Sequence, residues 1–173
     1  MDTYSLLRKG HEFLVHDSDG IELADVRVLK ADAYEKGHAF IYTQHSNDES
    51  IHIGIKKGRL LFAQYDYRIG NHSYSLQDHK GKSLIYYAVS GIVDGKTIYI
   101  EEDWDGGLEL KVEKEKIAKL KPFQVRKGAE ITFICGKEQA VFLPLLTLFY
   151  FMFQIYKKEV AFVEDLIEEA LEM

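Results

Sequence analysis

The chain has 173 residues, of which 46% are hydrophobic and 29% charged, with two prolines and one cysteine. This composition excludes a disordered tail, a collagen-like fibre and a disulfide-rich secreted module. A chain of this length buries roughly 70% of its unfolded surface, so one good-sized core is feasible. We therefore expect a single domain over residues 1–173, with Cys135 as a structural thiol in a reducing compartment.

The charge is distributed unevenly along the chain. Twenty-two Lys and Arg stand against 28 Asp and Glu, for a net charge of −6. Residues 159–173 contain no Lys or Arg and six acidic residues: Glu159, Glu164, Asp165, Glu168, Glu169 and Glu172. The rest of the chain is neutral and lacks the positive field that nucleic-acid binding requires, so we expect no nucleic-acid partner. Residues 1–13 lack the apolar core of a signal peptide, which predicts a cytoplasmic protein.

Short β-branched and aromatic segments, separated by turn sequences, follow one another from about residue 10 to 135. Strands that recur every 8 to 12 residues with Asp-Gly turns, as at 94–95, are typical of an antiparallel sandwich or barrel. Charges alternate with apolar residues over 111–127, which favours an exposed edge strand there. The predicted strands are 12–16, 21–29, 38–44, 51–55, 59–67, 72–76, 83–89, 96–101, 108–112 and 130–135.

The composition changes abruptly at residue 140. Residues 140–156 read AVFLPLLTLFYFMFQIY, which predicts a helix over about 138–158. Because this helix is apolar on every side, it must be surrounded by protein core or by lipid. Val160, Val163 and Ile167 then recur at helical spacing opposite the acidic residues, so 159–173 is either a continuation or a separate short amphipathic helix.

A series of short antiparallel strands that ends in one wholly apolar helix resembles the tubby C-terminal-like superfamily, which includes the phospholipid scramblases and the LURP-one-related proteins. The strand series, residues 83–103 (SLIYYAVSGIVDGKTIYIEED) and residues 140–156 carry the resemblance, and 65–87 are similar to hairpins of the smaller bacterial members. The resemblance implies a mainly β fold: a closed antiparallel barrel threaded by the hydrophobic helix. The acidic helical extension is additional to this pattern.

The resemblance also implies a function. We expect a non-enzymatic binding or regulatory module that contacts membrane lipid head groups, at the periphery of the membrane, or a protein partner through the acidic C-terminal helix. Tubby proteins bind phosphoinositides through basic surface residues, and Lys56, Lys57 and Arg59 at one hairpin tip are the lipid or anion candidates here. The alternative is a membrane-anchored β-domain in which 140–156 spans the bilayer. A lipocalin-like carrier, with its helix outside the barrel, is a third possibility.

The sequence offers little for catalysis or metal binding. It contains no nucleophile elbow, phosphate-binding glycine loop or dinucleotide fingerprint, so we predict no catalytic residues and no cofactor. His11 and His16 lack the spacing of a zinc-protease motif, and Asp17 to Gly20 has the composition of a plain turn. The best cation candidates are the four carboxylates Glu101, Glu102, Asp103 and Asp105, for which a solvated loop is the simpler interpretation. We expect no metal site.

Overall fold

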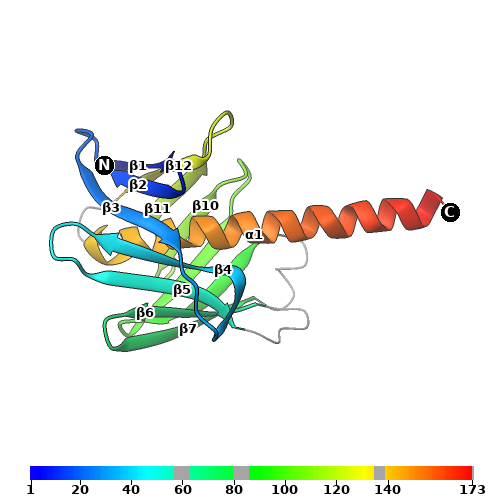
Figure 1. Cartoon of the computed structure of the whole chain (residues 1–173), viewed down its shortest axis with the longest axis horizontal. Helices are drawn as coiled ribbons and strands as arrows, with labels where there is room; N and C mark the ends of the chain where they lie inside the picture. The colour runs from blue at the N-terminus through cyan, green and yellow to red at the C-terminus, as the bar shows by residue number, and fades with distance from the viewer. Residues whose placement is uncertain (57–62, 80–85, 135–138, 173) are drawn as a thin grey trace.

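The described part of the chain forms twelve β-strands and one long helix (Figure 1). The computed structural model describes residues 1–56, 63–79, 86–134 and 139–172, and only the backbone of 166, 167 and 170–172. The elements are β1 (Asp2–Lys9), β2 (Glu12–His16), β3 (Glu22–Val28), β4 (Tyr34–Gln44), β5 (Ser50–Lys56), β6 (Gln64–Ile69), β7 (His72–Asp78), β8 (Ala88–Val93), β9 (Lys96–Glu102), β10 (Leu108–Val112), β11 (Glu115–Pro122), β12 (Gly128–Phe133) and α1 (Gln139–Glu172).

The strands form a closed up-and-down barrel. Each strand pairs in antiparallel fashion with its neighbours in the sequence, and β1 closes the barrel by pairing with both β2 and β12. The glycine at the start of β12 is required by this closure, because a Cβ on Gly128 would lie 2.0 Å from the carbonyl oxygen of Leu6. The predicted closed antiparallel barrel is confirmed, and all barrel edges among the described strands are paired.

Every second side chain of a strand points into the barrel, and these side chains do not fill its interior. In β10, for example, Leu108, Leu110 and Val112 are buried while the residues between them are partly exposed. Side chains alone fill a barrel of about eight strands, and the diameter grows with strand number. A barrel of twelve strands therefore encloses more space than its own inward side chains can occupy.

The first half of α1 fills that space. All twelve residues from Phe142 to Phe153 are buried, on every side of the helix. Aromatic side chains of the helix pack against those of the strands: Phe151 stacks on Phe40 with ring centroids 4.5 Å apart, and Phe149 lies 5.4 Å from Tyr65. Tyr150 accepts a hydrogen bond of 3.0 Å from the backbone N–H of Gly128, which ties the helix to β12.

The second half of α1 leaves the barrel. We expected either a continuation or a separate short helix over 159–173, and the chain forms one continuous helix from Gln139 to Glu172. Pro144 falls within its second turn, where it removes a single hydrogen bond to the first turn. Lys157 forms an ion pair with Glu102 at the end of β9, which marks the point of exit. Beyond it the helix projects away from the barrel (Figure 1).

Three expectations are corrected by the structure. Strand β1 was not predicted. Residues 111–127 do not form an edge, because β11 pairs with β10 on one side and β12 on the other. Their lysines face outward and pair with acidic residues of neighbouring strands, as Lys111 does with Glu101. A lipocalin-like carrier is also wrong, since the helix occupies the lumen that such a carrier would keep for its ligand.

Because only the first half of α1 is enclosed, a Phe→Asp substitution should destabilise the protein strongly in that half and weakly in the projecting half. Phe149→Asp should abolish folding, because a buried unpaired carboxylate costs several kcal/mol against a total stability of about 5–15 kcal/mol. Phe162→Asp, in the projecting part of the same helix where Phe162 is 62% exposed, should change the free energy of unfolding by less than about 0.5 kcal/mol. Urea denaturation followed by circular dichroism measures both. A stable Phe149→Asp protein would contradict burial of this face.

Candidate functional site

The predicted anion site is only partly described. Lys56 ends β5 and is exposed, whereas Lys57 and Arg59 lie outside the described residues, as does Cys135. The proposed convergence of three basic side chains therefore stays a prediction.

The predicted carboxylate cluster is dispersed. Glu101 pairs with Lys111 and Glu102 with Lys157, while Asp103 accepts hydrogen bonds from the backbone N–H groups of Asp105 and Gly107, at 3.0 and 2.8 Å. Asp103 therefore supports its own turn. Within the described residues, no group of three or more His, Cys, Asp or Glu side chains is placed to hold a metal ion.

The barrel wall contains a buried polar network around Asp66, which is only 2% exposed. Its carboxylate accepts hydrogen bonds from Tyr34, Arg68 and Ser73, at 2.8, 2.8 and 2.7 Å. Burial by itself would raise the pKa of Asp66, but these three hydrogen bonds and the Arg68 charge outweigh it and hold that pKa below its usual value. Burial and the bond to Asp66 raise the pKa of Tyr34 to about 12. Every partner of the carboxylate is a fixed side chain, so we interpret this network as structural.

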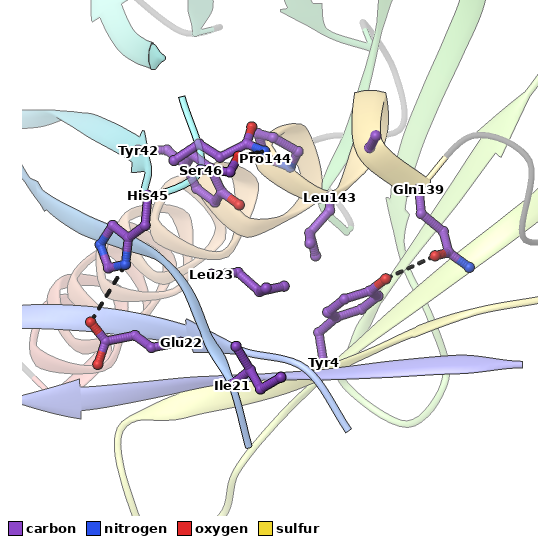
Figure 2. A pocket seen from close by; sticks show the side chains of 12 residues that line it. Tyr4, Ile21, Glu22, Leu23, Tyr42, His45, Ser46, Gln139, Leu143 and Pro144 are labelled. Carbon is purple, nitrogen blue, oxygen red and sulfur yellow. Dashed lines mark hydrogen bonds and ion pairs between the residues drawn. The ribbon is translucent and has the colours of Figure 1, made fainter. Parts of the chain in front are cut away.

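A cavity of about 500 Å³ lies at the end of the barrel where α1 begins, which we call the entry end. Figure 2 shows Leu23 and Leu143 at its centre, with one polar pair on either side. The lining comes from four separate parts of the chain: Tyr4; Ile21, Glu22 and Leu23; Tyr42, Gln44, His45 and Ser46; and Gln139, Ala140, Leu143 and Pro144. This cavity was not predicted, because no spacing within the sequence links these segments.

The two polar sides of this cavity differ in charge. On one side Tyr4 donates a 2.8 Å hydrogen bond to the side-chain oxygen of Gln139, and both groups are neutral. On the other side the ring nitrogens of His45 lie 3.6 Å from a Glu22 oxygen and 3.2 Å from an Asp25 oxygen. Asp25 also accepts a 2.7 Å hydrogen bond from Arg27. Since both ring nitrogens face carboxylates, His45 serves to hold this side of the cavity together.

Four exposed apolar residues lie at the opposite end, where α1 leaves the barrel, which we call the exit end. In an up-and-down barrel successive connections alternate between the two ends, so the β9–β10 and β11–β12 connections share one end. The ion pair between Lys157 and Glu102 shows that this is the exit end. Trp104 and Val125, in these two connections, are fully exposed, and Phe162 and Val163 on α1 are 62% and 52% exposed. The amphipathic repeat in the sequence includes Val163, whereas no motif marks Trp104 or Val125.

Comparison with known proteins supports the fold but does not assign the chain to a family. No protein-family description matches the sequence, and no curated protein matches it either. Among solved structures, the crystal structure of the Arabidopsis thaliana protein AT5G01750 is similar, with a TM-score of 0.51 and 11% sequence identity over 85% of this chain and 88% of that one. At 11% sequence identity, this similarity shows only that the two proteins share a similar fold.

The Asp66 network predicts a pH-dependent stability. Asp66→Asn should lower the free energy of unfolding at pH 7 by about 1.5–3 kcal/mol, because it removes hydrogen bonds to a charged group. A depressed pKa stabilises the folded state above the unfolded-state pKa, and that stabilisation disappears as the pH falls through the folded-state pKa. The difference between wild type and Asp66→Asn should therefore narrow below about pH 4.

Denaturant titrations between pH 2 and pH 7 test this dependence. Asp19→Asn is the matched control, since Asp19 is exposed in a turn and its replacement should be nearly neutral at every pH. A difference between wild type and Asp66→Asn that does not vary with pH would contradict the network.

Proposed function

We propose that the protein is a non-enzymatic binding module of the tubby-like type whose exit end docks a protein partner. The single observation that carries this proposal is the course of α1, which is buried on all sides over 142–153 and then continues into solvent with Phe162 and Val163 exposed. A barrel filled by its own helix holds that projecting segment rigidly in place. The tubby-like assignment rests on the barrel with its enclosed apolar helix, as the sequence resemblance implies.

The projecting segment, residues 157–172 of α1, has the properties of a docking helix. A helix of this length is marginally stable in water by itself, so contact with another surface would support it. Its sequence repeats Val160, Val163 and Ile167 at spacings of three and four, which is the pattern by which an amphipathic helix lies in an apolar groove. The acidic residues that alternate with this repeat favour a partner surface with Lys or Arg at its rim.

Trp104 and Val125 add a second contact region at the same end. Both are fully exposed, and Trp104 lies two residues beyond Glu102, which pairs with Lys157 at the base of the projecting segment. Exposed tryptophans supply a large share of the binding energy in protein interfaces. Asp105, which is exposed, adjoins Trp104, and this negative charge favours a protein partner over an anionic membrane surface.

The lipid-directed expectations stay predictions. Contact of Lys56, Lys57 and Arg59 with lipid head groups, and a cytoplasmic location at the membrane periphery, rest on the sequence resemblance. The segment Gln139–Asp165 is long and apolar enough to span a membrane, but 67% of its most apolar window is buried inside the protein. This enclosure favours the binding module over the membrane-anchored alternative, because the strands already cover the surface that lipid would contact.

Site-specific photo-crosslinking tests the docking surface. A benzophenone amino acid in place of Val163 should give a discrete covalent adduct with another protein in cells that express the protein naturally. Trp104→Ala should reduce the yield of that adduct severalfold, because a buried interface tryptophan contributes about 2 kcal/mol or more. Mass spectrometry of the adduct identifies the partner and the contacted residues.

The matched control places the same crosslinker at Ile92, which is equally apolar and 62% exposed but adjoins the β8–β9 turn at the entry end. Ile92 should give no discrete adduct. Equal adducts from both positions, or none from Val163, would contradict the proposal.

A further inference from the structure

The cavity at the entry end is separate from the proposed docking surface and has the build of a small-molecule site. Its volume of about 500 Å³ falls within the range of ligand pockets. Such pockets are mainly apolar with a few convergent polar groups that orient the ligand. This cavity follows that plan, with Leu23 and Leu143 at the centre and polar groups on two sides (Figure 2).

The apolar part of the cavity would accept a flat or branched hydrocarbon body. The rings of Tyr4 and Tyr42 contribute to the lining, together with Pro144. Ile21 forms part of the rim and is 59% exposed. A ligand seated between Ile21 and α1 would remove this side chain from water.

The charge of the lining selects the polar group of the ligand. Among the described residues, the lining contains no Lys or Arg, and its only carboxylate is Glu22, whose side chain is 40% exposed. Glu22 lies 3.6 Å from a ring nitrogen of His45, and behind this pair the carboxylates of Asp25 and Glu12 outnumber Arg27, with which both interact. A cationic group on the ligand would find a carboxylate partner here, whereas an anionic group would meet repulsion.

The opposite side of the cavity is neutral and already satisfied. The hydroxyl of Tyr4 and the amide of Gln139 bond to each other, and Gln139 also bonds to Asp2. The lining groups of this side therefore form a fixed polar wall without charge, and the Asp2 carboxylate lies behind them, outside the lining. The Glu22 side of the cavity therefore determines whether a cationic or an anionic ligand binds.

We propose that the entry-end cavity binds a small organic amine, with the apolar body against Leu23 and Leu143 and the protonated amine beside Glu22. The proposal is independent of the docking surface at the exit end, so either can fail without the other. It assigns no chemical reaction to the site.

Two probes of the same shape and opposite charge test this proposal on the full-length protein. Tryptamine carries an amine on an indole, and indole-3-propionate carries a carboxylate on the same ring system. In ¹H–¹⁵N NMR titrations, tryptamine should shift the amide signals of Leu23, Ser46 and Leu143 saturably, with a dissociation constant of about 1 mM or tighter. Indole-3-propionate should bind at least fivefold more weakly.

Variants locate the bound probe. Ala140→Trp adds a large side chain at an exposed position of the lining and should abolish the shifts, whereas Val141→Trp, one residue further along and also exposed, is outside the lining and should leave them unchanged. Glu22→Gln should weaken tryptamine about 1.5- to 5-fold, the range of a partly exposed ion pair, and remove most of the preference over the acid.

The Glu22→Gln arm leaves the apolar wall intact, so the test stands even if Ala140→Trp fails to fold. The proposal is overturned if tryptamine produces no saturable shifts at these amides, if indole-3-propionate binds as well as tryptamine, or if the preference survives Glu22→Gln.

Discussion

The enclosure of an all-round apolar helix is the constraint on which the structure depends. The segment from Phe142 to Phe153 has no polar side that could face water, and the only polar groups on its twelve side chains are the hydroxyls of Thr147 and Tyr150. A twelve-strand barrel in turn has more interior than its inward side chains fill. Each element removes the other's exposed apolar surface, so neither is expected to be stable alone. The hydrogen bond from Gly128 to Tyr150 and the ring stacking of Phe40 on Phe151 set the position of the helix within this shared core.

Because α1 fills the lumen, we look for binding functions at the two ends of the barrel. The ends differ in chemistry because α1 begins at one and leaves at the other. At the entry end, the first turns of α1 and the strand ends around Leu23 and Tyr42 leave a cavity with one negative side. At the exit end, the same helix carries exposed apolar residues and a net negative charge away from the barrel, beside Trp104. One rigid element thus links a small concave site to an extended convex surface.

The strand pattern and the apolar helix could be predicted from the sequence because both signals are local. Alternation in β10 and the uninterrupted apolar segment at 140–156 each need only neighbouring residues. Strand β1 was missed because only Leu6 is buried and its ends are charged, so it has little hydrophobic contrast. The charged alternation of β11 suggested an edge, yet the outer face of a closed barrel is solvated as well, and only the distant pairing partners distinguish the two cases. The cavity could not be predicted, since Tyr4, Ile21, His45 and Leu143 meet only through the barrel's closure and the entry of α1.

Hydrogen exchange along α1 tests the central claim most directly. If the barrel encloses the helix, the backbone amides of residues 146–153 should exchange only through global unfolding, and their protection should equal that of the strands. Amides of residues 160–165 in the same helix should exchange orders of magnitude faster, because their opening requires only local fraying. A clear step in protection near Lys157 is the predicted result. Protection that is uniformly low along α1 would show that the helix is not held inside the barrel, and the account given above would then be wrong.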